Sequence, residues 1–281
     1  MSFDRIAVIG GGRVGLTLAR ALVDSGRPVA VLGRHSRALP VPLDPMITAW
    51  EPALAAADLV LIAVPDDAIG EVALRMAQSG AITPRHVVLH TSGLHDRSAL
   101  AALDPSRAGL GSWHPLQTLA RPSGEPEALE GSPVVIEGDA RALAAGRELA
   151  AELRLRPVIE VAADHKARYH AAAVFASNYL VVLADLANRL AGGASREPVP
   201  ATLFLPLMQQ TLVHLGDGTA AALTGPVSRG DAGTVARHLA ALDVPERAVY
   251  LALAREALAL AVRSGLSADS ATAVEQVLRR Y

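Results

Sequence analysis

Residues 6–15 read IAVIGGGRVG, and the pattern of this stretch decides the fold class. A short apolar run leads into glycines at positions 10, 12 and 15, spaced as G-x-G-x-x-G, and a helix-forming segment follows. The first glycine permits a tight turn, the second lets the backbone approach a pyrophosphate, and the third permits close packing of helix against strand. The stretch therefore predicts a dinucleotide-binding turn made by Gly10, Gly11, Gly12, Arg13, Val14 and Gly15.

Further apolar runs alternate with helix-forming segments on either side of this turn. They read RIAVIG, PVAVLG, MITAW, DLVLIAVP, HVVLHTSG, LGSWH, PVVIEG and RPVIEV. The runs are apolar on successive residues, which is typical of strands buried on both faces of a doubly wound sheet. After residue 161 the strand signals stop, and the rest is helix-forming and rich in Ala and Leu. We therefore expect an α/β fold: a Rossmann-type parallel sheet in a dinucleotide-binding domain over residues 1–161, and an all-α substrate and dimerisation domain over residues 162–281.

Composition narrows the class of protein. The 281 residues are 51% hydrophobic and 19% charged, and the formal net charge of -2 provides no positive field for a nucleic acid partner. The chain has no Cys and none of the His and acid spacings typical of metal sites, so we expect no metal. Polar residues interrupt the longest apolar stretches, and the N-terminus does not resemble a signal peptide. We expect a cytoplasmic protein that does not associate with a membrane.

The end of the second predicted strand bears on the choice of dinucleotide. Sites that prefer NAD usually place an acid there, which binds the ribose hydroxyls, but this chain has Arg34, followed by Ser36 and Arg37. Cationic side chains suit a 2′-phosphate. The sequence thus predicts NADP as cofactor, with NADPH preferred over NADH; the alternative is a solvated basic loop.

Other strand ends should meet at the same edge of the sheet. Val64 and Pro65 end the run DLVLIAVP, and we expect their backbone to contact the nicotinamide half of the cofactor. The acids that follow, at positions 66 and 67, are predicted to cap a helix. Ser92 ends the next run, where its hydroxyl is either a substrate ligand or part of a turn. His114 ends another run and is a weaker candidate for substrate binding.

A further candidate site lies in DHKARYHAAAVFASNYL, residues 164–180. At roughly 100° per residue, His170 and Ser177 share a helical stripe with Lys166, and Asn178 lies off it. A buried Lys is rare without a partner or a task. We expect Lys166 to polarise or protonate the substrate, His170 to orient it or act as the acid, and Asn178 to hold the helix or a water. The alternative is a solvated first helical turn followed by a core histidine.

The helical domain adds two expectations. Arg229, in the loop LTGPVSRGDAG at 223–233, either binds a substrate carboxylate or belongs to an interhelical turn held by a salt bridge. The segments FLPLMQQTLVHL, residues 204–215, and YLALAREALALAV, residues 250–262, carry more apolar surface than a small domain can cover. We therefore expect a homodimer built mainly by this domain.

The quoted motifs together resemble a bacterial family of Rossmann-like oxidoreductases with a C-terminal helical domain of unknown function. The family lies within the 6-phosphogluconate and β-hydroxyacid dehydrogenase superfamily. GGGRVG, AVPDDAI, HTSG, SWHPLQ, K-x-x-Y-H-A-A-A-V-F-A-S-N-Y and LTGPVSRGD carry the resemblance over nearly the whole chain. It implies a nicotinamide cofactor, a helical dimerisation domain and a cleft between domains, but no substrate. The HPL of SWHPLQ is also similar to a region of prephenate dehydrogenases.

The same resemblance bears on the catalytic residues. In β-hydroxyacid dehydrogenases a catalytic Lys is followed four residues later by Asn; here Lys166 is followed by His170, so the Asn role passes to His170 or to Asn178. We expect an NADP-dependent oxidoreductase that transfers a hydride between nicotinamide and a small carbonyl, imine or hydroxy compound. The alternative is an NADP-binding sensor or assembly protein without turnover.

Overall fold

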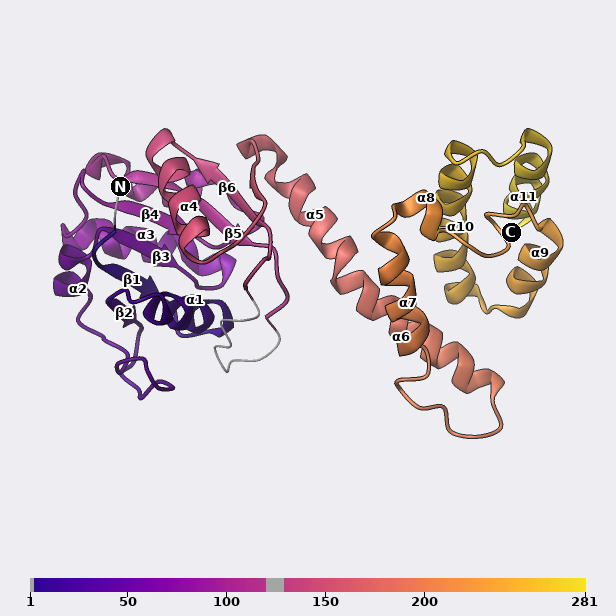
Figure 1. Ribbon diagram of the computed structural model, residues 1–281, viewed down its shortest axis with the longest axis horizontal. Coiled ribbons are helices and arrows are strands. Elements are labelled where there is room, and N and C mark those ends of the chain that lie inside the picture. The colour runs from indigo at the N-terminus through magenta and orange to yellow at the C-terminus, as the bar shows by residue number, and fades with distance from the viewer. Residues whose placement is uncertain (1–2, 120–128) are drawn as a thin grey trace. The chain divides into compact units, whose positions relative to one another are not determined.

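The computed structural model describes residues 3–119 and 129–281, and its chain divides into two compact units, Met1–Val182 and Leu183–Tyr281 (Figure 1). The last strand, β7, ends at Glu160, close to the domain boundary expected after residue 161, but the compact units divide after Val182. The first compact unit continues beyond the last strand, through helix α5. The first turns of the helix that carries Lys166 therefore belong to the same unit as the sheet.

A seven-stranded sheet forms the centre of the first unit, in the order β2-β1-β3-β4-β5-β6-β7. Its strands are β1 (Ile6–Ile9), β2 (Val29–Leu32), β3 (Leu59–Ile62), β4 (Val87–His90), β5 (Gly109–Pro115), β6 (Val134–Gly138) and β7 (Val158–Glu160). The strand order reverses between β1 and β3, and in open α/β sheets ligands bind at such a switch point, beyond the carboxyl ends of the strands. The predicted doubly wound α/β fold is confirmed.

Two details of the sheet differ from the sequence-based expectation. Strand β6 runs antiparallel to β5, whereas every other neighbouring pair is parallel. An antiparallel pair needs no crossover helix, so alternation of strand and helix signals does not reveal it. The run MITAW, residues 46–50, forms only an isolated bridge between Ile47 and Leu32, because helix α2 already begins at Trp50.

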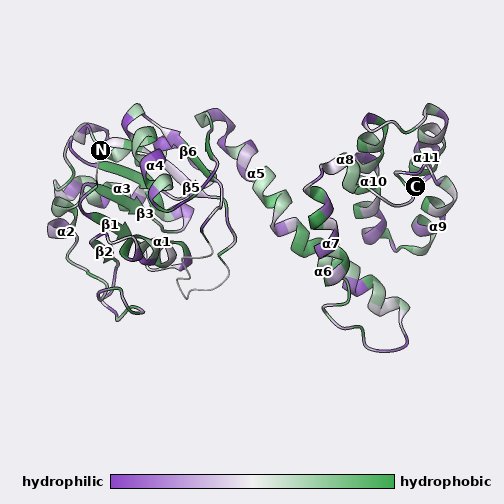
Figure 2. Cartoon of the chain, in the orientation of Figure 1, coloured by the Kyte–Doolittle hydropathy of each residue, from purple (hydrophilic) through white to green (hydrophobic). Residues whose placement is uncertain are grey.

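Helices cover both faces of the sheet, which explains its apolar strands (Figures 1 and 2). Successive residues of one strand enter opposite cores: Ile6 and Val8 of β1 pack into one, and Ala7 and Ile9 into the other. The first core also contains buried residues of α1 (Arg13–Asp24) and α4 (Ala140–Glu152). The second contains residues of α2 (Trp50–Ala56), α3 (Ile69–Ser79) and the 3-10 segment η2 (Arg97–Ser106).

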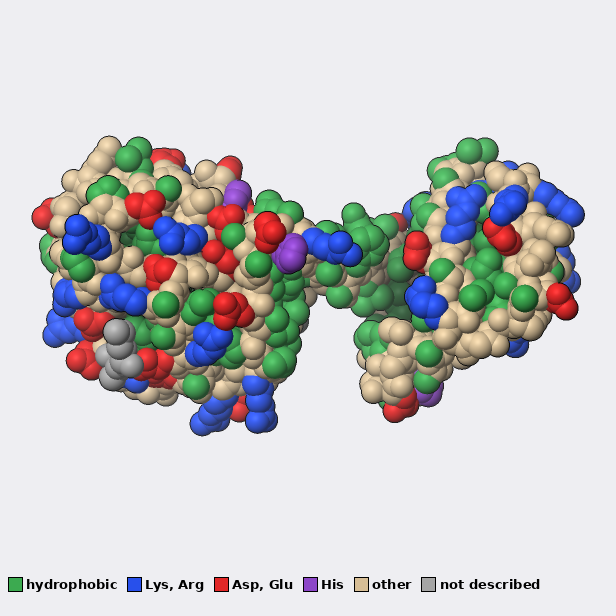
Figure 3. Space-filling view, turned by 90° about the horizontal axis from the view of Figure 1, so that it is seen from above, with side chains coloured by type: hydrophobic (Ala, Val, Ile, Leu, Met, Phe, Trp, Pro, Cys, Tyr) green, Lys and Arg blue, Asp and Glu red, His purple; other side chains and the backbone are tan. Residues whose placement is uncertain are grey.

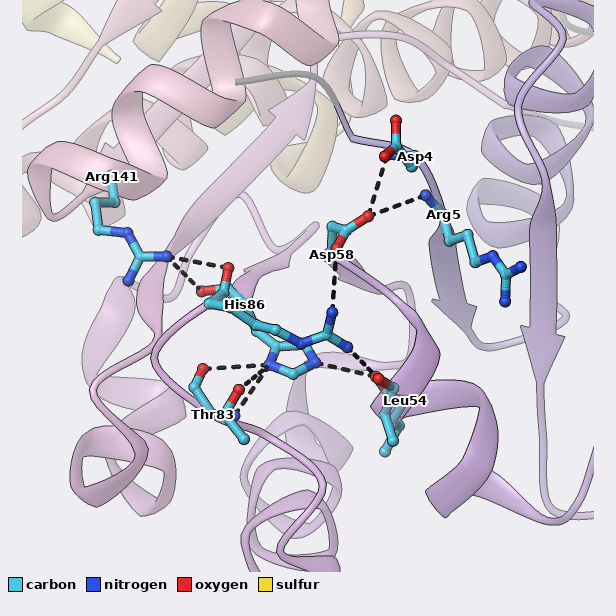
Figure 4. Close-up of polar contacts among 9 residues, drawn as sticks. Asp4, Arg5, Leu54, Asp58, Thr83, His86 and Arg141 are labelled. Atoms are coloured by element: carbon cyan, nitrogen blue, oxygen red, sulfur yellow. Dashed lines mark hydrogen bonds and ion pairs between the residues drawn. The ribbon is translucent and has the colours of Figure 1, made fainter.

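The amino edge of the sheet contains a polar cluster whose bonds are internal (Figure 4). The ring of His86 is fully buried; its Nε2 lies 3.1 Å from the carbonyl oxygen of Leu54, and its Nδ1 accepts the backbone N–H of Thr83 at 3.0 Å. Asp58 accepts the N–H groups of residues 4 and 5, and Arg141 donates to the carbonyl of His86 at 3.2 Å. These groups tie loops together, and His86 is a structural histidine.

The second unit is all helical, as the sequence predicts for this part of the chain. Its helices are α6 (Asn178–Ala194), which begins in the first unit, α7 (Leu205–Leu215), α8 (Thr219–Ala222), α9 (Ala232–Ala241), α10 (Val244–Arg263) and α11 (Ala268–Arg280). A core between α9, α10 and α11 contains Val235, Leu251 and Val274. A capping box of Asp243 and Glu246 begins α10.

One helical run within the described residues, Ala163–Ala194, is long and apolar enough to cross a membrane by length and composition alone. Inspection of the sequence predicts no such run, so that expectation is corrected. The run contains four charged residues beyond its first turn, Lys166, Arg168, Asp185 and Arg189, and Lys166 is bonded to the sheet. The absence of a membrane partner stays a prediction.

Candidate active site

The glycine-rich turn after β1 has the geometry that its motif predicts. Gly10 has a φ of 115°, and a Cβ at this position would lie 2.2 Å from the carbonyl oxygen of Ala63, so a side chain is excluded. A Cβ on Gly15 would lie 1.9 Å from the carbonyl oxygen of Gly10, which is the close packing of helix on strand expected from the third glycine. Gly12 caps α1 without a side-chain bond and faces open space. The N-terminus of α1 therefore borders the glycine turn, which is where a pyrophosphate site places a helix.

A cleft of about 580 Å³ opens beside this turn. Seven predicted cofactor residues line it: Gly10, Gly11, Gly12, Arg34, Arg37, Val64 and Pro65. Four others do not: Arg13, Val14 and Gly15 open helix α1, and Ser36 is exposed on its loop. The volume lies in the range of small-molecule and cofactor sites. The arrangement fits a dinucleotide, with the glycine turn, the end of β2 and the end of β3 around one cavity.

The two arginines of the cleft differ in their contacts. Arg37 donates from Nη2 to the carbonyl oxygen of Gly11, which brings its guanidinium over the glycine turn. Arg34 is exposed and makes no hydrogen bond or ion pair within residues 3–119 and 129–281, so its charge is available to a ligand. The cleft also contains the acids at positions 67 and 71. The prediction that the acids at 66 and 67 cap a helix is wrong: Pro65 is the N-cap of the short segment Asp66–Ala68, and no side chain caps it.

Lys166 is the single lysine of the sequence, and it is buried, with 1% of its surface exposed. It opens α5 (Lys166–Ala176), and its Nζ donates to the carbonyl oxygen of Ser92 at 3.1 Å and to Ser112 Oγ at 2.9 Å. Ser112 Oγ in turn lies 3.3 Å from the carboxylate of Glu137. Burial lowers the pKa of Lys166 to about 8, against the opposing charges of Glu137 and Asp96. The ammonium group thus joins α5 to the ends of β4 and β5.

The turn after β4 is held by its own side chains. Ser92 is buried, and its hydroxyl accepts the N–H groups of Leu94 at 3.1 Å and His95 at 3.0 Å. Its backbone N–H donates to His90 Nδ1 at 3.3 Å, so the Nε2 of His90 carries the proton and donates to the carbonyl of Asp96 at 3.0 Å. Burial lowers the pKa of His90 to about 4. The Ser92 hydroxyl therefore has the turn role that was the alternative to a substrate ligand, and its carbonyl holds Lys166.

Two further histidines meet beside Gly93. His114 Nδ1 lies 2.7 Å from Tyr169 Oη, and the two rings meet edge to face with centroids 5.7 Å apart. The ring of His170 stands 6.3 Å from that of His114. A Cβ on Gly93 would lie 2.6 Å from His170 Nδ1 and 3.1 Å from His114 Nε2, so both rings occupy space that any side chain would need. His170 Nδ1 is buried and has no hydrogen-bond partner among the described residues.

Gly93, His114, Tyr169 and His170 form a cluster, which we call the Gly93 cluster, and burial shifts the pKa of two of its side chains. It lowers the pKa of His114 to about 4, with smaller contributions from the charges of Lys166 and His170. It also raises the pKa of Tyr169 to about 12. At neutral pH both His114 and Tyr169 are therefore uncharged, which leaves Lys166 as the buried cation of the site.

Three polar residues that the sequence singles out, Ser177, Asn178 and Arg229, lie outside the Gly93 cluster. Helix α5 ends at Ala176, and its C-cap Ser177 has φ -122° and ψ -69°; the Ser177 hydroxyl donates to the carbonyl oxygen of Ala173 at 2.8 Å. Asn178 is exposed and lies with its Oδ1 2.8 Å from Ser177 Oγ. Arg229 is an exposed residue of the second unit and forms no ion pair with another described residue. Asp231, two residues further on, caps α9 by accepting the N–H of Thr234 at 2.9 Å.

Sequence reasoning missed Gly93, Ser112, Glu137 and Tyr169. Tyr169 stands in the quoted stretch beside His170, and its polar tip within an apolar helix was a signal. Glu137 could not be found in this way, because it meets Ser112 only through the antiparallel register of β5 and β6. Within the part of the chain that the structure describes, no group of acids and histidines is placed to hold a metal ion.

Comparisons with known proteins agree with this architecture. Residues 3–110 match the family described as Rossmann-like domain, and residues 132–257 match the family Domain of unknown function (DUF2520). No curated protein matches the sequence. The fold is similar to that of protein TM1727 from Thermotoga maritima, with 21% identity, a TM-score of 0.70 and coverage of 92% of this chain and 98% of that one.

Two other solved structures extend the likeness. Protein BF3122 from Bacteroides fragilis is 22% identical, with a TM-score of 0.67 and coverage of 91% of this chain and 98% of that one. The reductive aminase from Aspergillus terreus, solved with NADPH and ethyl-5-oxohexanoate, is 19% identical, with a TM-score of 0.57 and coverage of 99% and 93%. At these identities the likeness shows a shared fold.

Proposed function

We propose that this chain, which joins a Rossmann-like domain to a DUF2520 domain, is an NADP-dependent oxidoreductase acting on a small carbonyl, imine or hydroxy compound. One observation carries the proposal: the dinucleotide cleft lies at the same edge of one sheet as the buried Lys166 and the partly buried His114 and His170. The cleft is at the ends of β1 and β3, and these three residues lie at the ends of β4 and β5, which follow directly in the strand order.

The cofactor half of the proposal rests on the glycine turn and the two arginines. The open N-terminus of α1 would hold the pyrophosphate, and Arg34 and Arg37 would pair with a 2′-phosphate. The backbone of Val64 and Pro65 would meet the nicotinamide half. When bound, the cofactor supplies or takes up the hydride. The A. terreus reductive aminase, whose fold this chain shares, was solved with NADPH, which supports a nicotinamide cofactor.

The proposed reaction requires a group that stabilises negative charge on the substrate. A hydride that reaches the substrate carbon leaves negative charge on its oxygen or nitrogen, and this charge needs a cation or a proton donor nearby. Lys166 supplies a buried cation beside the Gly93 turn, where low polarity strengthens its field. The partly exposed imidazole of His170, which lies beside His114, would orient the substrate. Ser92 would act through its carbonyl, by fixing Lys166.

The choice of residue at position 166 supports a task for its amine. The chain contains 26 basic residues, and every one except Lys166 is Arg. An arginine stays protonated in proteins, whereas the pKa of a buried lysine falls readily. At about 8, the pKa of Lys166 allows both protonation states near physiological pH. A purely structural cation in this buried position would not require this property.

We also propose a homodimer built mainly by the helical part of the chain. Exposed apolar side chains follow α5 to α7, among them Phe175, Val181, Leu207, Leu212 and Val213. Hydrophobic side chains gather on the segment α5–α6 in Figure 3, and α6 and α7 are predominantly apolar in Figure 2. Exposed apolar side chains that are contiguous on a helix mark interaction surfaces, so a second copy of the chain is the proposed cover.

The proposed reaction is tested by NADPH oxidation with a panel of ketones, aldehydes and imines, followed at the nicotinamide absorbance. Binding of NADPH is measured separately by titration of the wild type, Lys166→Ala and His170→Ala. We expect both variants to bind NADPH like the wild type and to turn over roughly 10²-fold more slowly. Wild-type rates in both variants would contradict the assignment of these residues, and tight NADPH binding without oxidation by any compound would favour a sensor.

A further inference from the structure

We propose that Tyr169 and His114 form a proton relay, in which His114 Nε2–H protonates the substrate heteroatom and the phenol of Tyr169 donates a proton to His114 Nδ1. The inference rests on the proposed function and names a proton donor within that site. It starts from the 2.7 Å contact between Tyr169 Oη and His114 Nδ1, which joins helix α5 to strand β5.

The geometry gives each nitrogen of His114 a separate task. Of the two neutral groups the phenol is the stronger acid, so the favoured hydrogen bond has Tyr169 O–H donating to Nδ1. The proton of the neutral ring then resides on Nε2. This nitrogen has no hydrogen-bond partner among the described residues, and it lies 3.1 Å from the position that a Cβ of Gly93 would take. His114 can thus receive a proton on one side and give one on the other.

A relay is needed because His114 does not supply a proton by itself. The ring is partly buried, and the groups whose charges act on it are Lys166, His170 and Asp66; burial and the first two lower its pKa to about 4. An imidazolium is therefore scarce at neutral pH. A neutral ring can still pass on a proton if another proton arrives at Nδ1 in the same step, and Tyr169 is bonded at that atom.

The step balances as follows. The hydride brings two electrons to the substrate carbon, and the π bond between this carbon and its oxygen or nitrogen breaks. The heteroatom takes the proton from His114 Nε2, and Nδ1 takes the proton of Tyr169, so His114 changes tautomer and stays neutral. The phenolate that remains is stabilised by the Nδ1–H of His114 and regains its proton from water. For a carbonyl substrate the net transfer is favourable, because a phenol is a stronger acid than an alcohol.

His170 completes the arrangement from the other side of Gly93. Its Nδ1 and His114 Nε2 approach the same point, at 2.6 and 3.1 Å from the position of the missing Cβ. The absence of a side chain at Gly93 lets the two rings pack close together, with centroids 6.3 Å apart, so His170 positions the ring of His114.

The chain contains a second His–Tyr pair that serves as a matched control. In the helical unit His238 Nδ1 lies 3.0 Å from Tyr250 Oη, and the rings meet edge to face with centroids 5.8 Å apart. Tyr250→Phe removes the same kind of bond as Tyr169→Phe but lies outside the Gly93 cluster. A loss of kcat common to both variants measures the structural contribution of such a bond. A loss of kcat confined to Tyr169→Phe measures the contribution of the relay.

The experiment compares the wild type, Tyr169→Phe, Tyr250→Phe and His114→Gln on a compound that the wild type reduces. Thermal melting confirms that each variant is folded, and NADPH titration confirms that the cofactor binds. We expect kcat to fall roughly 10²-fold in Tyr169→Phe and His114→Gln, with Tyr250→Phe at the wild-type rate. Nitrogen-15 NMR of labelled histidine should find His114 protonated at Nε2 in the wild type, with this preference weakened in Tyr169→Phe.

The possible outcomes distinguish failure of the relay from failure of the proposed function. A wild type that turns over while Tyr169→Phe keeps its kcat overturns the relay and leaves the proposed function standing. A His114 protonated at Nδ1 in the wild type also overturns it, because Tyr169 then accepts instead of donating. A wild type that reduces no carbonyl or imine refutes the proposed function, and the relay with it.

Discussion

Replacing Lys166 by methionine should abolish a specific pH dependence of stability. Burial lowers the pKa of Lys166 from an ordinary value of 10.5 to about 8. Between these two values the unfolded chain keeps the proton that the folded chain has released, so the free energy of unfolding rises with pH there. The difference corresponds to roughly 3 kcal/mol, gained in full by about pH 10.5. The variant Lys166→Met has a side chain of similar length and no charge, and it lacks this gain.

The comparison of the two proteins isolates the effect of the lysine. Methionine removes the hydrogen bonds to Ser92 and Ser112 at every pH, so this loss lowers the free energy of unfolding by the same amount throughout and leaves its pH dependence unchanged. Urea unfolding at a series of pH values from 7 to 10.5 gives both curves. We expect the wild-type curve to rise relative to that of Lys166→Met by roughly 3 kcal/mol across this range. Parallel curves would refute the argument that burial suppresses the charge of Lys166.

A second assay uses the composition of the chain. Because Lys166 is the single lysine, a protein labelled with carbon-13 at the lysine side chain gives one lysine resonance, whose titration reports the pKa directly. A midpoint near 8 agrees with the buried ammonium described above, and a midpoint near 10.5 contradicts it.

Three further predictions concern the cofactor, the Gly93 cluster and the assembly. NADPH should bind more tightly than NADH by about 1.5–3 kcal/mol, and Arg34→Asp should erase this difference. The control Arg263→Asp, in the last turn of α10, should leave it intact. Equal affinities of the wild type for NADPH and NADH would contradict the prediction. Gly93→Ala should push His170 and His114 apart and lower kcat without changing NADPH affinity. The control Gly192→Ala, at a helix position where a Cβ would meet no atom within 4 Å, should leave kcat unchanged. A wild-type kcat in Gly93→Ala would count against a role of the Gly93 cluster. Light scattering at micromolar concentration should give the mass of a dimer, and a mass of 29.1 kDa would contradict the proposed assembly.

The sequence predicts those features that depend on local pattern. The glycine spacing after β1 is a property of ten consecutive residues, and the positive φ of Gly10 and the tight contact at Gly15 follow from it. The apolar runs likewise reflect burial on both faces of the sheet. Lys166 and His170 were also found locally, because polar groups on an apolar helix need partners.

Features that depend on distant pairing could not be predicted in this way. The bond between His114 and Tyr169 joins residues 55 positions apart, and the one between Ser112 and Glu137 depends on the antiparallel turn of strand direction at β6. The hydroxyl of Ser92 had two equal interpretations until the N–H groups of residues 94 and 95 were placed beside it. The helical stripe also does not indicate that the Ser177 hydroxyl donates to the carbonyl oxygen of Ala173.

The central claim is that the nicotinamide extends from the cleft at the end of β3 toward the Gly93 cluster. A crystal structure with NADP bound tests this most directly. We predict that nicotinamide C4 lies beside Val64 and Pro65, so that a substrate carbon about 3–3.5 Å from C4 brings its heteroatom to hydrogen-bond distance from His114 Nε2. A nicotinamide that points away from Gly93, His114 and His170 would contradict the account.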